Sequence, residues 1–198
     1  MILSLKQQLV EAFIATHAFK HNPAGFKLAS GLVSPYYVDC RVLLAHPRPR
    51  SLIARMALDA LRGVMVDSVG GLEIGAIAIA TSISDQGLIE SPPQEWRTFV
   101  VRKQPKDHGL EKLIEGAFQP GDRALIVDDV LTSGKSILKA VAAARNAGMR
   151  VTHALVIVDR EEQDGRGRVE EQGVKLLSLL TIEDLLAARQ VSQTRTED

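Results

Sequence analysis

The stretch Arg123–Val141 reads RALIVDDVLTSGKSILKAV and joins an apolar run, an acidic pair and a hydroxyl-rich loop. Ala124–Val127 is apolar at every position, as a central strand of a parallel sheet is. Asp128 and Asp129 follow directly, so they are expected where the strand ends and a ligand-facing loop begins. The stretch therefore predicts a strand, a functional loop and a helix over Lys135–Ala147.

The loop after the acidic pair carries hydroxyls and backbone N–H groups at the start of the predicted helix. Such a helix N-terminus is a site for phosphate. Serine and threonine are also common helix caps, so the loop alone is equally typical of both roles. The hydrolase P-loop is excluded, because the GKS at Gly134–Ser136 would need a glycine where Asp129 stands.

The rest of the chain predicts an α/β fold with a central, mainly parallel sheet flanked by helices. Ligands in that architecture bind at the carboxyl ends of the strands. The remaining strands are expected at Met65–Val69, Thr98–Val101 and Val151–Val158, with a further helix at Ile74–Ser84.

The two ends of the chain contribute helices and a flap. An amphipathic N-terminal helix is expected, and GFKLASGLVSPYYVDCRVLL (25–44) reads as a hairpin or an extended flap. A helix introduced by Pro47 and Pro49 stops at Gly63, and TIEDLLAAR (181–189) is another. Residues 190–198 are predicted to be a disordered tail. We expect one domain over 1–198, with the N-terminal helix and hood at about 1–45 and the ligand-binding core at about 64–160.

The composition restricts the function classes. The 198 residues are 45% hydrophobic, and 24 basic residues balance 24 acidic ones. A formal charge of zero argues against nucleic-acid binding and against an anionic membrane surface. The single Cys40 can form neither an internal disulfide nor a cysteine-based zinc site, which favours a reducing, cytoplasmic setting. The N-terminus suits neither a secretion signal nor a membrane span.

The acidic pair needs a partner other than a polyphosphate, which it would repel. The hydroxyls of a ribose fit, met directly or through a metal ion. LIVDDVLTSGKSI resembles the phosphoribosyl-pyrophosphate (PRPP) signature of the type I phosphoribosyltransferases. The resemblance implies that fold, with a small N-terminal hood over the active site. It also implies PRPP contacts from Asp128, Asp129, Val130, Leu131, Thr132, Ser133, Gly134, Lys135 and Ser136.

A basic segment, FVVRKQPKDHGLEKLIEGAF, follows the second strand of the core. By composition alone it is a solvated loop. Its pattern RK..K.HG...IEG is similar to the orotate phosphoribosyltransferases, in which a mobile loop reaches the neighbouring subunit's active site. The resemblance implies a homodimer and PRPP contacts from Arg102, Lys103, Lys106 and His108. Lys103, Lys106, His108, Asp128 and Asp129 are then the expected catalytic residues.

The flap and the end of the last predicted core strand resemble the same family's base pocket. FKLASGLVSPYYVDCR matches the segment that covers the pyrimidine, and VIVDREE places Arg160 where the family binds the base carboxylate. The resemblance implies orotate contacts from Tyr36, Tyr37, Thr132 and Arg160. Taken alone, the flap is an ordinary aromatic hairpin and Arg160 a surface ion pair.

The chain departs from the commonest family pattern at two lysine positions, where it has Ala29 and Gly75. Lys27 could point to the same face as a lysine at Ala29. The glycines at Gly70, Gly71 and Gly75 would let backbone amides approach pyrophosphate directly.

The resemblance implies transfer of ribose 5-phosphate from PRPP to orotate, giving orotidine 5'-monophosphate and pyrophosphate in pyrimidine biosynthesis. Mg²⁺ is the implied cofactor, held mainly by PRPP and water, with Asp128 and Asp129 as the candidate protein ligands. His108 is a candidate proton donor to the leaving group. Two alternatives stay open: a phosphoribosyltransferase for another base and a non-catalytic PRPP sensor.

Overall fold

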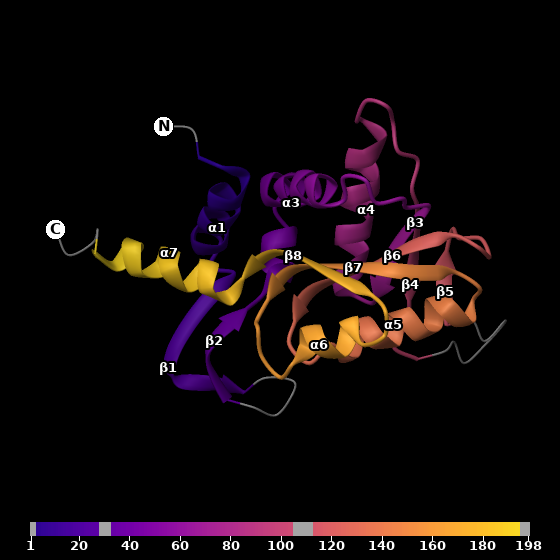
Figure 1. Cartoon of the computed structure of the whole chain (residues 1–198). Coiled ribbons are helices and arrows are strands. Elements are labelled where there is room, and N and C mark those ends of the chain that lie inside the picture. The colour runs from indigo at the N-terminus through magenta and orange to yellow at the C-terminus, as the bar shows by residue number, and fades with distance from the viewer. Residues whose placement is uncertain (1–2, 28–32, 105–112, 195–198) are drawn as a thin grey trace.

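The computed structural model describes residues 3–27, 33–104 and 113–194. At its centre lies a six-stranded sheet in the order β5-β4-β3-β6-β7-β8, in which only β5 runs antiparallel to its neighbour (Figure 1). The fold is therefore α/β with a mainly parallel sheet, as the sequence predicts. The strands are β3 (Ser68–Leu72), β4 (Arg97–Val101), β5 (Ile114–Gly116), β6 (Arg123–Leu131), β7 (Arg150–Asp159) and β8 (Lys175–Thr181).

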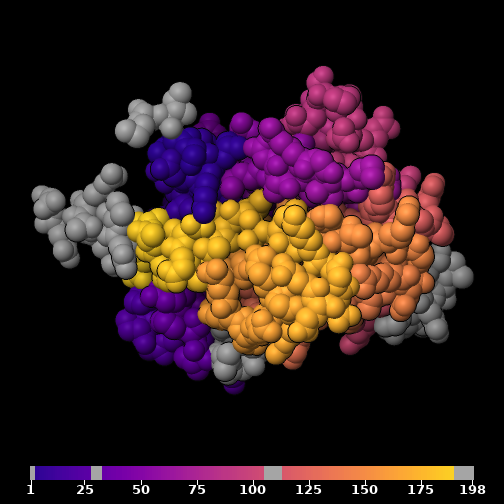
Figure 2. All heavy atoms as spheres, viewed as in Figure 1, coloured from indigo at the N-terminus to yellow at the C-terminus, as the bar shows by residue number. Residues whose placement is uncertain are grey.

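Helices cover both faces of the sheet. One core contains buried residues of α1 (Leu5–Ala15), α3 (Pro47–Ala60) and α4 (Gly75–Leu88). The other contains α5 (Lys135–Asn146) and Val169 of α6 (Gly165–Glu170). The last helix, α7 (Ile182–Thr194), lies beside α1 (Figure 2), where Lys6 pairs with Asp184 at 2.9 Å. None of the helices in the described ranges has the length and apolar character to cross a membrane.

The N-terminal hood is a separate two-stranded antiparallel sheet of β1 (Phe19–Lys27) and β2 (Val33–Val38). It lies at one side of the main sheet, below α7 in Figure 1. The expected flap over 25–44 is partly wrong, because the hairpin begins at Phe19 and its last residues form α2 (Cys40–Leu44). The carboxylate of Asp39 starts that helix by accepting a hydrogen bond from the Arg41 N–H.

The expected strand Met65–Val69 is displaced, since β3 runs from Ser68 to Leu72. Gly70 and Gly71 are typical of a loop in sequence, but both lie inside the strand. A Cβ on Gly70 would come within 2.3 Å of the Phe99 carbonyl, and one on Gly71 within 2.0 Å of the Val127 carbonyl. The glycines thus permit close packing within the sheet.

The acidic pair lies inside β6 and not after it, because pairing with β7 continues to Leu131. The expected elements at Thr98–Val101, Val151–Val158, Ile74–Ser84 and Lys135–Ala147 are confirmed within a few residues. The sequence prediction lacked β5, α2, α6 and β8, which are short or flanked by polar segments. The last helix extends to Thr194, into the segment predicted as a tail.

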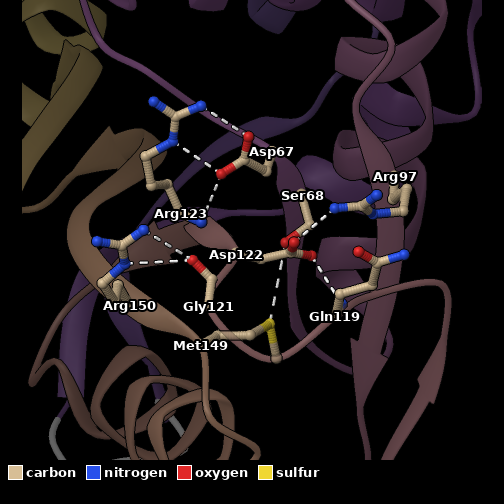
Figure 3. A network of polar contacts seen from close by, with 9 residues as sticks. All are labelled: Asp67, Ser68, Arg97, Gln119, Gly121, Asp122, Arg123, Met149 and Arg150. Atoms are coloured by element: carbon tan, nitrogen blue, oxygen red, sulfur yellow. Dashed lines mark hydrogen bonds and ion pairs between the residues drawn. The ribbon is translucent and has the colours of Figure 1, made fainter.

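The amino ends of the strands carry a network of ion pairs (Figure 3). Arg123 donates to both oxygens of Asp67, each at 2.7 Å, and its backbone N–H donates to the same carboxylate. Asp122, 6% exposed, accepts from Arg97 and from the Gln119 backbone N–H. The Asp67 and Asp122 carboxylates are thus fully paired at the edge of the sheet opposite to the expected site.

Candidate active site

A cavity of about 530 Å³ opens at the carboxyl ends of the parallel strands. Each of β3, β4, β6 and β7 delivers residues to it, and the hood closes one side. The lining comprises Tyr37, Val38, Asp39 and Arg41 of the hood region, residues 72–75, Lys103, residues 128–137 and Arg160. Most described residues predicted for the site thus share one cavity.

Each carboxylate of the acidic pair lines the cavity and accepts a hydrogen bond from the backbone N–H of the next residue. One Asp128 oxygen accepts from the Asp129 N–H at 3.0 Å, and one Asp129 oxygen accepts from the Val130 N–H at 2.9 Å. Burial, followed by the neighbouring charge of Asp129, raises the pKa of Asp128 well above its usual range. Burial also raises the pKa of Asp129. In the described part of the chain, no arginine or lysine forms an ion pair with either carboxylate.

The hydroxyl loop does not cap its own helix. Gly134 is the N-cap of α5, with φ 75°, and no side chain makes a capping hydrogen bond there. Of the two roles open for this loop, the helix cap is therefore wrong, and its hydroxyls remain available to a ligand. The loop is supported from behind by α6, because a Cβ on Gly165 would come within 2.3 Å of the Thr132 carbonyl.

Lys103 enters the cavity from the end of β4. Its backbone N–H donates to the Glu73 carboxylate at 2.7 Å, and its carbonyl accepts from the Lys139 ammonium. Arg102, in contrast, pairs with Glu115 at 3.1 Å and does not line the cavity. The predicted Lys106 and His108 lie outside the described residues, as does Ala29.

Arg160 is 4% exposed and lies at the end of β7, where its backbone N–H donates to the Leu131 carbonyl at 3.0 Å. It is therefore a buried cavity residue, although its guanidinium also forms an ion pair with the partly exposed Glu162 at 2.9 Å. Tyr37 also lines the cavity, whereas the Tyr36 ring stacks on Phe19 at 5.8 Å beside it.

Asp39, Arg41 and Glu73 are cavity residues that sequence reasoning missed. Arg41 pairs with Asp39 at 3.0 Å and donates to the Tyr37 hydroxyl at 3.4 Å. The hydrogen bond from Arg41 lowers the pKa of Asp39. Asp39 and Arg41 stand within the same SPYYVDCR motif as the tyrosines, so the sequence contained a signal for them.

Gly75, one of the two departures from the family pattern, lies against the acidic pair. A Cβ at this position would be 3.1 Å from the Asp129 carboxyl carbon. That distance is tighter than ordinary van der Waals contact, so any side chain would press on the carboxylate. The glycine therefore leaves the Asp129 carboxylate its present position.

Comparison with known proteins agrees with this geometry. Residues 75–178 match the family model "Phosphoribosyl transferase domain". The chain is 42% identical to the orotate phosphoribosyltransferase of Aquifex aeolicus, over 81% of this chain and 86% of that protein. It is 39% identical to that of Pyrococcus abyssi, over 96% of this chain and the whole of that one. The chain belongs to the orotate phosphoribosyltransferase family.

The fold agrees with solved structures of the same family. The orotate phosphoribosyltransferase of Mycobacterium tuberculosis in complex with PRPP superimposes with a TM-score of 0.72 and is 29% identical, over 93% of both chains. The family membership extends to the hood, which precedes the matched domain. Tyr37 of the hood, and Asp39 and Arg41 directly after it, therefore lie within the part of the chain that is shared with orotate phosphoribosyltransferases.

Proposed function

We propose that this chain transfers ribose 5-phosphate from PRPP to orotate, giving orotidine 5'-monophosphate and pyrophosphate in pyrimidine biosynthesis. The observation that carries the proposal is that one cavity holds all of these groups. It is lined by the hydroxyl loop before α5, by two carboxylates that form no ion pair with any described residue, by a lysine and by a buried arginine. Each of these groups complements a different part of the two substrates.

PRPP occupies the part of the cavity formed by β6 and the loop that follows it. The 5-phosphate accepts hydrogen bonds from the loop at 132–136, at the N-terminus of α5. Asp128 and Asp129 accept hydrogen bonds from the 2- and 3-hydroxyls of the ribose. The Lys103 ammonium stabilises the charge that develops on the departing pyrophosphate, together with Lys106 and His108 of the basic loop.

Orotate lies between the hood and the end of β7. The Arg160 guanidinium binds the base carboxylate, a pairing that suits its planar, permanent charge. The hood segment at Tyr36 and Tyr37 covers the pyrimidine, and Thr132 contacts it. A ring nitrogen of the base then displaces pyrophosphate at the anomeric carbon, and the covered site excludes the water that would hydrolyse the activated sugar.

Mg²⁺ fits the groups that the cavity offers. Within residues 3–27, 33–104 and 113–194, no three His, Cys, Asp or Glu side chains come together as a metal cage. Two adjacent carboxylates without an ion-pair partner suit a cation that keeps several waters and substrate phosphates as ligands. Bound there, Mg²⁺ would neutralise charge on pyrophosphate and ribose oxygens, and Asp128 and Asp129 would orient it.

A homodimer completes the site in this proposal, with the basic loop of one subunit over the cavity of the other. Ile74 lines the cavity and is 67% exposed, and Ile77, three residues further along the chain, is 45% exposed. Exposed apolar side chains at a cavity suit a subunit interface. The buried thiol of Cys40 suits the cytoplasm as the compartment.

The proposal is tested by a spectrophotometric assay with purified protein, PRPP and Mg²⁺. We expect orotate to be consumed and pyrophosphate to be released in equal amounts. Turnover of uracil or a purine without turnover of orotate would assign the chain to another base. Binding of PRPP without turnover of any base would indicate a sensor.

A further inference from the structure

The Arg160 guanidinium is already paired with a carboxylate of its own chain. Its Nε donates to one Glu162 oxygen at 3.1 Å and its Nη2 to the other at 2.9 Å. This is the bidentate arrangement in which arginine binds carboxylates most strongly. An internal carboxylate thus occupies one edge of the group proposed to bind the base carboxylate.

The other contacts of Arg160 define the edge that remains. Nη2 also donates to the Ser34 hydroxyl at 2.9 Å, so both of its N–H groups are used. Nη1 has only a long contact, 3.5 Å, to the Tyr36 carbonyl. Nη1 is thus the guanidinium nitrogen least used by the chain, and Arg160 is one of the residues that line the cavity.

The Arg160 guanidinium keeps donors for a ligand, but Glu162 already neutralises its positive charge. Arg160 is 3% exposed at its side chain, whereas Glu162 is 36% exposed. The pair is neutral, so a ligand carboxylate entering beside it places two negative charges around one guanidinium. In a partly desolvated site that repulsion lowers the affinity for the ligand.

We infer that Glu162 is a specificity-determining positioning residue: its carboxylate fixes the Arg160 guanidinium and weakens the binding of the base carboxylate. This inference rests on the proposed function, since it assigns Arg160 to the orotate carboxylate. Glu162 is not one of the residues that line the cavity, so it acts through Arg160. Ser34 holds the same guanidinium without charge, and its hydroxyl also accepts from the Tyr36 N–H at 3.2 Å, which links Arg160 to the hood.

The test separates charge from position. Glu162→Gln keeps the shape of the side chain and removes its charge, so KM for orotate should fall about three- to fivefold, the range of a partly screened charge interaction. The kcat should change less than twofold. The inhibition constant of uracil, which lacks the carboxylate, should not change.

Glu161→Gln is the matched control. It removes the same charge one residue away, and the Glu161 side chain is exposed and makes none of the described contacts to Arg160. KM for orotate should stay at the wild-type value. An equal fall in both variants, or an unchanged or raised KM in Glu162→Gln, would overturn the inference.

A second variant keeps the inference testable if Glu162→Gln folds poorly. Glu162→Asp retains the charge, so its KM for orotate should be no lower than that of the wild type, and a fall would overturn the inference. Failure of the wild type to consume orotate would refute the proposed function itself. Normal wild-type turnover with no change of KM in Glu162→Gln would refute only the role of Glu162.

Discussion

Aspartates have opposite surroundings at the two ends of the strands of the central sheet, which we call its amino and carboxyl edges. At the amino ends of the strands, Asp67 and Asp122 accept hydrogen bonds from Arg123 and Arg97. Hydrogen bonds from Arg123 lower the pKa of Asp67, whereas burial raises the pKa of Asp128 at the carboxyl ends. The same residue type is thus a paired structural group at one edge and an unpaired group in a cavity at the other.

The difference separates stability from ligand binding. A buried carboxylate without a counter-ion destabilises the folded chain. Within the described structure, Asp128 and Asp129 each accept one backbone hydrogen bond, but neither forms an ion pair. Such a loss of stability is expected where a bound ligand supplies the missing counter-ion or hydrogen-bond donors. Substitutions at the two edges should therefore have opposite consequences for stability and for activity.

The largest effect is expected from removing both charges at the carboxyl edge. Asp128→Asn with Asp129→Asn should lower turnover about 10³-fold, because the proposed function assigns these carboxylates to the ribose and to Mg²⁺. The melting temperature should not fall. Steady-state kinetics measures the turnover and calorimetry the melting temperature. Retained turnover would refute the assignment of the acidic pair to the ribose and Mg²⁺.

A substitution at the amino edge should give the reverse result. Asp122→Asn leaves the half-buried Arg97 without its counter-ion and should cost about 3 kcal/mol of unfolding free energy, or about 6–12 °C in Tm. Turnover at 25 °C should stay within about twofold of wild type. A loss of activity without a loss of stability would contradict the separation of roles.

The stability of the two edges should depend on pH in opposite directions. Asp128 has a raised pKa, so the folded chain holds a proton that the unfolded chain loses above its ordinary value of 3.8. The free energy of unfolding of the wild type should then fall as the pH rises. At neutral pH, Asp128→Asn should be more stable than the wild type by about 2 kcal/mol. Asp67 has a lowered pKa, so its contribution is present above 3.8 and is lost as the pH falls.

Urea titrations over a range of pH measure this pair of trends. The excess stability of Asp128→Asn over the wild type should grow with rising pH. The deficit of Asp67→Asn should shrink as the solution is acidified. Parallel curves for the wild type and Asp128→Asn would show that Asp128 is ionised normally.

The smallest effect is expected from giving the carboxyl edge a cation. Gly75→Lys places an ammonium within reach of Asp129. The free energy of unfolding that is lost as the pH rises should therefore be smaller by about 1 kcal/mol than in the wild type. Gly75→Gln has similar reach without the charge and serves as the control. An equal change in both variants would assign the effect to crowding of the carboxylate and not to charge.

The sequence predicted which residues share the cavity better than it predicted the limits of the helices and strands. The apolar run before Asp128 and the loop after it identified the strand, loop and helix, because continuous apolar runs and helix periodicity are local signals. It misplaced β3, since the glycines at Gly70 and Gly71 fit a turn until the neighbouring carbonyls are known. Glu73 lies in none of the matched motifs, and Glu162 ends the VIVDREE stretch without a predicted role. Their roles depend on contacts with Lys103 and Arg160 that only the fold creates.

The pairing of β6 with β7 also fixes the distance between the backbone positions of the acidic pair and Arg160. Asp128 lies opposite Val156, and Leu131 opposite Asp159, so the acidic pair and Arg160 are carried by two directly hydrogen-bonded strands. Neighbouring strands are about 4.8 Å apart, a spacing that substitutions in side chains do not alter. The separation between the proposed sugar site and the proposed base site is therefore a property of the backbone. Evolution or engineering toward another base would have to work through the hood and the residues that follow β7.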